Sequence, residues 1–155
     1  RLRDIVEGLE KVRKSFGFEL IYPVHPRARR LLAEFGLDPS DVRLIEHLDY
    51  LSFLQLESNA RLVLTDSGGI QEEATAPLLR KPVLVIRLST ERPEAVEAGF
   101  ARVVGVEKKS IVKGIEQTLK KKGTLLKMSP YGDGRAAEKI VGILKEEGAE
   151  GVVRS

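Results

Sequence analysis

A turn of small residues, Asp66-Ser67-Gly68-Gly69, offers the most favourable arrangement for ligand chemistry in this sequence. It follows the apolar run 61–65, which is typical of a buried strand, and it precedes a helical pattern that begins at Ile70. In open parallel sheets, ligands bind beyond the carboxyl ends of the strands, and glycine lets the backbone approach them closely. The unpaired N–H groups of the first helical turn and the Ser67 hydroxyl would suit a phosphate. The same residues would also serve as a simple helix cap, so spacing alone leaves both interpretations open.

Two glutamates, Glu72 and Glu73, follow within the first turns of the same predicted helix. Negative charge is favourable there, so compensation of the helix dipole is one explanation for either residue. A carboxylate at this position could instead accept hydrogen bonds from the two hydroxyls of a ribose. Neither the P-loop nor the GxGxxG fingerprint is present, so general motifs do not decide between the two explanations.

A second polar cluster, residues 89–94, follows the next predicted strand, and we therefore expect it at the same edge of the sheet. Its Arg92 could pair with a diphosphate through the planar guanidinium group. The position before Pro93 is equally compatible with a surface residue at the entry to a helix, because proline favours the first helical position.

Short apolar strands alternate with amphipathic helices throughout the chain, and these elements must position both clusters. Strands without polar alternation are typical of sheets covered on both faces. The pattern predicts an α/β fold with a Rossmann-like, doubly wound parallel sheet flanked by helices. The predicted strands are 18–24, 42–45, 61–65, 82–86 and 102–104. The predicted helices are one that opens the chain and ends at Gly17, one from Pro26 to Gly36, and 50–57, 70–79, 94–98, 109–121 and 134–147. Within 50–57, Leu51 and Leu54 are expected to face inward.

Residues 1–147 are predicted to form one domain, and residues 148–155 a flexible tail. The chain opens with a helix, whereas a Rossmann-type sheet begins with a strand. A helix on such a sheet needs parallel strands beneath its apolar stripe, so we expect a first strand that is missing from this sequence.

Composition narrows the class of protein. Of the 155 residues, 42% are hydrophobic and 32% charged, which fits a folded globular domain. No apolar run approaches the ~20 residues of a membrane helix, no signal-peptide pattern is present and cysteine is absent. A cytoplasmic protein without disulfides is the simplest interpretation. The net charge of +3 includes the run Lys120-Lys121-Lys122 at a predicted helix end, where lysine complements the helix dipole, so no nucleic-acid or membrane partner is expected.

Several ordered segments resemble the non-hydrolysing UDP-N-acetylglucosamine 2-epimerase family. These segments are Tyr22–His25, Leu64–Ala74, Lys81–Val85, Thr90–Gly99 and Ser129–Gly134. The resemblance covers nearly the whole chain and implies the carboxyl-terminal domain of a two-domain, GT-B-like enzyme with its active site between the domains. The amino-terminal domain of that family, with the carboxylates thought to handle the sugar C2 proton, is missing from this sequence.

The resemblance implies roles for the residues of both clusters. Ser67, Gly68 and Gly69 would hold the diphosphate of UDP, and Arg92 would pair with phosphate oxygens. Glu73 would bind the ribose. No metal, cofactor or catalytic acid–base residue is expected in this chain.

The same resemblance implies a site for the base and a second ligand site. Phe53 would lie against the uracil, and the backbone of Leu48 would read its edge. His25 would touch a regulatory UDP-N-acetylglucosamine, as in bacterial members, although a histidine after a strand is also commonly structural. His47 matches no motif and is expected in a loop. Leu88 replaces the usual aspartate of the family, and the segment 74–80 is longer than the common form.

The reaction of the family interconverts UDP-N-acetylglucosamine and UDP-N-acetylmannosamine by inverting C2. UDP is thought to be eliminated and then added back, so its developing charge needs donors already in place. We therefore expect the UDP-binding portion of such an epimerase, inactive alone, with the missing amino-terminal domain and a second copy of the chain as protein partners. A GT-B glycosyltransferase domain and a non-catalytic nucleotide-sugar-binding module remain as alternatives.

Overall fold

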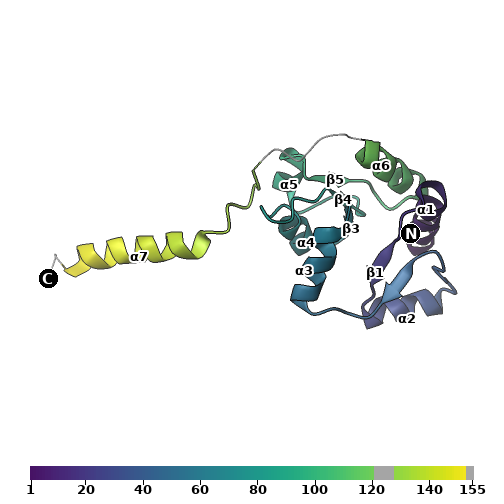
Figure 1. The fold of residues 1–155 in the computed structure, drawn as a ribbon, viewed down its shortest axis with the longest axis horizontal. Coiled ribbons are helices and arrows are strands. Elements are labelled where there is room, and N and C mark those ends of the chain that lie inside the picture. Colours follow the sequence, from purple (N-terminus) through teal and green to yellow (C-terminus); the bar gives the residue numbers. More distant parts are fainter. Residues whose placement is uncertain (121–127, 153–155) are drawn as a thin grey trace.

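Helices and strands alternate along the chain in the computed structural model, which describes residues 1–120 and 128–152, with side chains to 146 (Figure 1). In chain order the elements are α1 (Leu2–Phe16), β1 (Ile21–Pro23), α2 (Pro26–Glu34), β2 (Arg43–Ile45), α3 (Tyr50–Asn59), β3 (Val63–Thr65), α4 (Gly68–Glu73), β4 (Val83–Val85), α5 (Pro93–Glu97), β5 (Ala101–Val103), α6 (Lys108–Lys120) and α7 (Ala136–Val152). Every predicted helix and strand therefore has a counterpart. The first four strands are shorter than predicted, and β5 has the predicted length but begins one residue earlier.

The strands form two parallel sheets. β1 pairs with β2, and a separate sheet has the order β3-β4-β5. A helix connects each strand to the next, so all pairings are parallel. The predicted Rossmann-like α/β fold is thus confirmed, but the expected single sheet is divided between β1 and β3.

Helices cover both faces of β4, as the doubly wound prediction requires. Successive residues of a strand point to opposite faces. Leu84 packs with Val12 of α1 and Ile111 of α6, whereas Val83 and Val85 belong to a second core cluster on the α4 and α5 side. The sheet β3-β4-β5 is therefore enclosed, and its carboxyl edge is held in a fixed position.

Helix α6 lies unusually close to the end of β5. A Cβ atom added at Gly114 would lie 2.5 Å from Cγ1 of Val104. Only glycine permits this approach, which brings Ile111 and Ile115 into the core beside α1.

Helix α4 is much shorter than predicted. It ends at Glu73, with Ala74 as its C-cap, instead of continuing to residue 79. Pro77 cannot donate a backbone hydrogen bond and disfavours a helical residue before it. Thr75 Oγ1 also donates to the Glu72 carbonyl at 2.8 Å. The segment after α4 consequently forms tight turns, in which Arg80 has φ 48°.

Helix α7 extends away from the rest of the chain (Figure 1). It begins at Ala136 and runs to Val152, so the predicted boundary between domain and tail, at residue 147, falls within it. Its exposed apolar residues are Ile140, Val141, Ile143 and Leu144. Lys121 and Lys122 lie outside the described residues. None of the helices in the described part of the chain is long and apolar enough to span a membrane.

Candidate functional site

The turn between β3 and α4 is fixed by its own polar groups. Ser67 is the N-cap of α4, and its Oγ accepts a hydrogen bond from the Ile70 N–H at 3.5 Å. The Ser67 N–H donates to Oγ1 of Thr65 at 3.0 Å, and the Gln71 side chain donates to the Ser67 carbonyl at 3.1 Å. Capping, one of the two interpretations from sequence, is therefore present, and it leaves the following backbone groups available.

Gly68 and Gly69 form the first helical positions of α4. Neither has a positive φ, so backbone conformation does not explain their type. Among the described hydrogen bonds, none uses either N–H group. A Cβ atom at Gly68 would lie 3.6 Å from Cζ of Arg92, so glycine here permits the close approach of a guanidinium group. The Arg92 guanidinium thus lies beside Gly68, in a turn whose first two helical N–H groups have no described acceptor.

Arg92 is held by contacts on several sides. It is the N-cap residue of α5, its N–H donates to Oγ1 of Thr90 at 3.1 Å, and Nη1 donates to the Glu91 carbonyl at 3.0 Å. Nε donates to Oε1 of Glu72, and this charged hydrogen bond is the main cause that raises the pKa of Arg92. The predicted neighbourhood of Arg92 and the small-residue turn is thus present. The ion pair with Glu72, by contrast, was not anticipated, because the sequence indicated only a helix-dipole role or a ribose role for that residue.

A buried hydrogen-bond chain joins the two loops and was also missed from the sequence. Gln71 is fully buried, and its Oε1 accepts from Oγ1 of Thr90 at 2.5 Å while its amide donates to Ser67. Thr90 in turn accepts from the Arg92 N–H. The side chains of Gln71 and Thr90, 19 residues apart in the sequence, therefore connect the position of Ser67 to that of Arg92. The spacing of residues in the sequence does not predict such a contact.

Glu73, the predicted ribose ligand, closes α4. Burial raises its pKa, and the neighbouring charge of Glu72 raises it further. Glu57 of α3 lies within electrostatic range of Glu73 and is only 3% exposed. Neither Glu57 carboxylate oxygen has a hydrogen-bond partner, and burial followed by the charge of Glu73 raises the pKa of Glu57 to about 7. The sequence alone does not single out Glu57, because a polar residue in an amphipathic helix is expected to face solvent.

The segment before α7 borders the same site. Ser129 Oγ lies 2.8 Å from Thr75 Oγ1, just beyond α4, and the Tyr131 hydroxyl donates to Glu94 of α5 at 3.5 Å. Burial, followed by the charge of Glu94, raises the pKa of Tyr131. This segment was part of the family resemblance without an assigned role, and it forms one side of the surroundings of Arg92.

The two residues expected around the base lie on or before α3. Phe53 is a partly buried residue of α3, and Leu48 lies in the loop that precedes this helix. Leu48 lines a groove of about 370 Å³ together with Ile21, Ile45 and residues of α3. None of the residues lining this groove belongs to the Ser67 turn, so a continuous nucleotide site across both regions stays a prediction.

His25 has a structural role in this fold. It is the N-cap of α2, and its Nδ1 accepts from the Arg27 N–H at 3.2 Å. Its ring lies edge-on to that of His47, with centroids 6.4 Å apart. The expected loop position of His47 is confirmed, while contact between His25 and a regulatory ligand stays a prediction.

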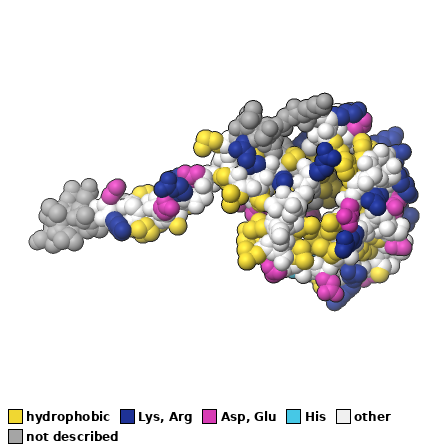
Figure 2. Space-filling model, viewed as in Figure 1, with side chains coloured by type: hydrophobic (Ala, Val, Ile, Leu, Met, Phe, Trp, Pro, Cys, Tyr) yellow, Lys and Arg dark blue, Asp and Glu magenta, His cyan; other side chains and the backbone are white. Residues whose placement is uncertain are grey.

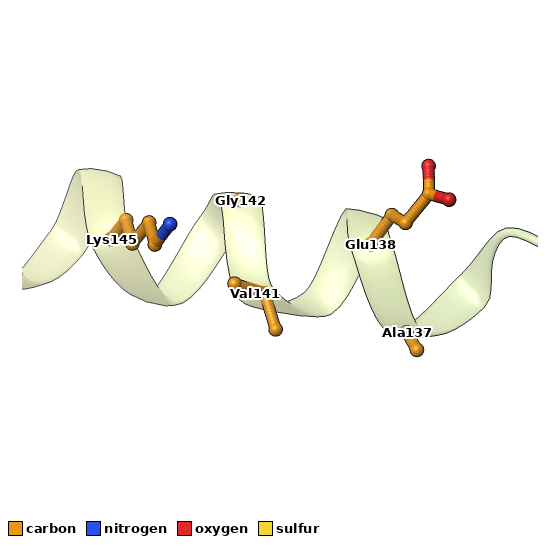
Figure 3. Close-up of a pocket in the computed structure, with 5 residues that line it drawn as sticks. All are labelled: Ala137, Glu138, Val141, Gly142 and Lys145. Atoms are coloured by element: carbon orange, nitrogen blue, oxygen red, sulfur yellow. The ribbon is translucent and has the colours of Figure 1, made fainter.

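A larger groove, of about 460 Å³, lies along α7 and is lined by residues of that helix alone (Figure 3). Its side chains leave the helix in different directions, and α7 lies apart from α4 and α5 (Figures 1 and 3). The groove along α7 is therefore separate from the site at Ser67 and Arg92. Within the described residues, no group of three or more His, Cys, Asp or Glu side chains could hold a metal ion.

Proteins described as UDP-N-acetylglucosamine 2-epimerases match this chain. A family model described as UDP-N-acetylglucosamine 2-epimerase matches residues 1–145. The UDP-N-acetylglucosamine 2-epimerase of Methanocaldococcus jannaschii is 42% identical over 149 residues, which cover 93% of this chain and 40% of that protein. The enzyme of the same name from Escherichia coli K12 is 47% identical over 133 residues, covering 82% of this chain and 35% of that protein.

Solved structures agree with these sequence matches. The UDP-GlcNAc 2-epimerase of M. jannaschii superposes with a TM-score of 0.84 at 41% identity, over 94% of this chain and 41% of the other. Its complex with UDP-GlcNAc and UDP gives a TM-score of 0.82, over 94% and 40% of the two chains. The present chain thus spans less than half the length of these relatives. The extent of the match and the level of identity show that the chain belongs to the UDP-N-acetylglucosamine 2-epimerase family.

Proposed function

We propose that this chain is the UDP-binding part of an enzyme that interconverts UDP-N-acetylglucosamine and UDP-N-acetylmannosamine. The observation that carries the proposal is the Arg92 guanidinium, which lies beside Gly68 at a turn whose first N–H groups have no described acceptor. Backbone donors and a planar cation at one turn suit the oxygens of a diphosphate. A relative of known structure was solved with UDP-GlcNAc and UDP, which supports a nucleotide-sugar ligand.

The diphosphate is the leaving group of the proposed reaction. A base removes the C2 proton, and the electron pair of that C–H bond forms a C1=C2 double bond in the sugar. The bond between C1 and the diphosphate oxygen breaks at the same time, and its electron pair leaves with UDP. Donors already in position at Gly68, Gly69 and Arg92 stabilise this developing charge without reorganisation. The buried link through Gln71 and Thr90 keeps the two loops in register during the reaction.

The remaining assignments follow from the same proposal. Glu73 binds the ribose hydroxyls, while Phe53 and the backbone of Leu48 hold the uracil. UDP then stays bound until the sugar is reprotonated on its opposite face and UDP is added back. The groups that move the C2 proton belong to the amino-terminal domain of the longer polypeptide. A cytoplasmic homodimer that supplies precursors of cell-envelope polysaccharides is part of this proposal.

Titration calorimetry with UDP tests the assignment of Arg92. Arg92→Ala should weaken UDP binding about ten- to a hundredfold, as expected for the loss of hydrogen bonds from a charged donor. Arg87→Ala is the matched control. Arg87 also lies in the loop after β4, and its guanidinium pairs with the Glu91 carboxylate at 2.9 Å. Equal affinity in the Arg92→Ala variant and the unmodified chain would remove the basis of the proposal.

A second measurement addresses the reaction. The enzyme extended by its amino-terminal domain should exchange the C2 proton of UDP-N-acetylglucosamine in deuterium oxide, and this 155-residue chain should not. Transfer of the sugar to an acceptor without exchange at C2 would indicate a glycosyltransferase instead.

A further inference from the structure

Glu72 has no task in the proposed reaction, although it contacts the arginine that the reaction uses. It follows Gly68 by four positions in α4, a helix with no acidic residue in its first turn. The interaction of a charge with the helix dipole falls off within that turn, so it does not account for a glutamate here. Residues four apart lie on the same face of a helix, and Gly68 and Glu72 both contact Arg92.

The neighbouring Glu73 has different surroundings. Consecutive residues of a helix point about 100° apart. The charge of Glu73 acts on the buried Glu57 of α3, whereas the carboxylate of Glu72 accepts a hydrogen bond from Nε of Arg92. The two glutamates therefore face different sides of α4. This arrangement agrees with the ribose role proposed for Glu73 and leaves Glu72 to Arg92.

Two of the three nitrogen atoms of the Arg92 guanidinium have acceptors. Nε donates to Oε1 of Glu72, and Nη1 donates to the Glu91 carbonyl at 3.0 Å. None of the described hydrogen bonds uses Nη2, which lies 3.6 Å from the position of a Cβ atom at Gly68. Because a guanidinium group is planar, the contacts of Nε and Nη1 also fix the direction of Nη2. The remaining donor of Arg92 is thus held beside the Ser67 turn.

The other acidic side chains near this guanidinium have partners of their own. Oε1 of Glu91 accepts from Nη2 of Arg87 at 2.9 Å, and the Tyr131 hydroxyl donates to Oε2 of Glu94 at 3.5 Å. Within the part of the chain that the structure describes, the hydrogen bond to Nε is the one contact of the Glu72 carboxylate. Glu72 is therefore the side chain that sets the position of Nε.

The ion pair of Glu72 with Arg92 contributes little to folding. The two side chains are 40% and 34% exposed, and ion pairs with this much contact with solvent add little stability. The loop itself is held by other groups, because the Arg92 N–H donates to Thr90 and Thr90 donates to the buried Gln71. Loss of the Glu72 carboxylate would therefore release the guanidinium without displacing the loop.

The negative charge of Glu72 is unfavourable for an anionic ligand, so its presence needs another reason. Lys and Arg side chains of the body are interspersed with Asp and Glu on the face shown in Figure 2, without one extended basic patch. Attraction by the overall charge of this face therefore does little to place an anion. The direction of individual donors decides where a diphosphate binds, and an acceptor for Nε fixes that direction.

We propose that Glu72 is a positioning residue, which holds the Arg92 guanidinium so that Nη2 lies beside Gly68 before the diphosphate binds. The inference rests on the proposed function, because it requires that Arg92 binds the diphosphate. An arginine side chain has several rotatable bonds, and orienting it in advance avoids the loss of their freedom on binding. This gain exceeds the repulsion between the Glu72 carboxylate and the ligand.

A double-mutant cycle, measured by NMR titration with UDP, tests this role. Glu72→Ala should weaken UDP binding about five- to tenfold when Arg92 is present, and less than about twofold in the Arg92→Ala background. Glu72→Gln should keep most of the affinity, because its amide oxygen can still accept from Nε. Glu91→Ala is the matched control. It removes a nearby carboxylate but keeps the carbonyl that accepts from Nη1, so the affinity for UDP should not fall.

Uridine separates the positioning role from the alternatives. It shares the base and the ribose with UDP but has no phosphate, so Glu72→Ala should leave the affinity for uridine unchanged. An equal loss for uridine and UDP would assign Glu72 to the ribose or to the fold and would overturn the proposal. So would tighter or equal binding of UDP by the Glu72→Ala variant, because the carboxylate would then compete with the diphosphate.

A measurement without ligand keeps the inference separate from the proposed function. In NMR spectra of the free chain, hydrogen exchange of the Arg92 Nε–H should be slow, and this protection should be lost in the Glu72→Ala variant. Equal exchange in the two chains would show that the ion pair does not form in solution, which contradicts the positioning role. If Arg92→Ala weakens UDP binding but Glu72→Ala does not, the positioning role alone is wrong. If Arg92→Ala has no effect, the proposed diphosphate site fails, and the positioning role fails with it.

Discussion

At the scale of single residues, Glu57 is the group whose protonation is most sensitive to its surroundings. It is 3% exposed, its carboxylate oxygens have no hydrogen-bond partner, and its pKa is raised from 4.5 to about 7. The charged form therefore has a cost that the neutral form avoids. Because the charge of Glu73 contributes to this shift, α3 and α4 are electrostatically coupled near the proposed ribose position.

This coupling predicts a pH-dependent stability. Between pH 4.5 and about 7 the folded chain keeps the Glu57 proton that the unfolded chain has released, so the free energy of unfolding falls as pH rises through this window. The loss is complete above about pH 7 and amounts to at most about 3 kcal/mol. Glu57→Gln should remove this slope and make the chain more stable than wild type at pH 8, as measured by urea unfolding at pH 5 and pH 8.

The control for this experiment is Glu97→Gln, since Glu97 is an exposed residue of α5. It should keep the slope of the unmodified chain. A Glu57→Gln variant with the same pH dependence as wild type would mean that Glu57 reaches solvent or finds a partner in solution.

Individual residues also show the limits of prediction from sequence. The proximity of Ser67 and Arg92 could be predicted, because parallel strands bring the residues after their carboxyl ends to one edge. The contacts of Gln71 with Thr90 and of Arg92 with Glu72 could not, since they depend on side-chain positions within the folded core. Leu51 was expected to face inward but is 75% exposed, because an apolar side chain alone does not fix which face of a short helix is covered.

At the scale of secondary-structure elements, periodicity and turn residues located every helix and strand, but only some of their ends. Gly17 ends α1 with φ 68°, as its type predicts. Helix α4 was predicted to continue to residue 79 but ends six residues earlier, at Glu73. Pro77 and the turn after Ala74 end it, although the residues of this segment otherwise favour a helix. The separation of β1 from β3 was not visible in the strands themselves, and the missing first strand expected from the sequence stays a prediction.

The contact between α6 and the end of β5 predicts the effect of a single methyl group. Gly114→Ala would place a Cβ atom 2.5 Å from Val104, so either α6 or Val104 must move. We expect a loss of about 1–3 kcal/mol in the free energy of unfolding. Gly142→Ala is the matched control, because nothing lies within 4 Å of that position in α7 and alanine favours a helix. Equal stability of the two variants in urea unfolding would show that α6 does not pack this closely in solution.

At the scale of the whole molecule, the chain consists of a packed body and a projecting helix. The body holds both core clusters and the site at Ser67 and Arg92, and it makes its last described side-chain contacts with the segment before α7. α7 presents Ile140, Val141, Ile143 and Leu144 to solvent. Its helical structure therefore contributes little to the stability of the body, in contrast to the short segment that precedes it.

Two truncations separate these contributions. A chain that ends at Arg135 lacks α7 and should unfold at the same urea concentration as the full chain. A chain that ends at Met128 also loses the contacts of Ser129 with Thr75 and of Tyr131 with Glu94. Its free energy of unfolding should fall by about 1–2 kcal/mol, since each hydrogen bond contributes about 1 kcal/mol net.

Circular dichroism at increasing urea concentration gives the unfolding midpoint of all three chains. The first truncation should reduce the helical signal without a change in midpoint, because it removes helix and leaves both cores complete. A lower midpoint for the chain ending at Arg135 would mean that α7 packs onto the body in solution and covers apolar surface there. An unchanged midpoint for the chain ending at Met128 would mean that the Ser129–Gly134 segment does not stabilise the surroundings of Arg92.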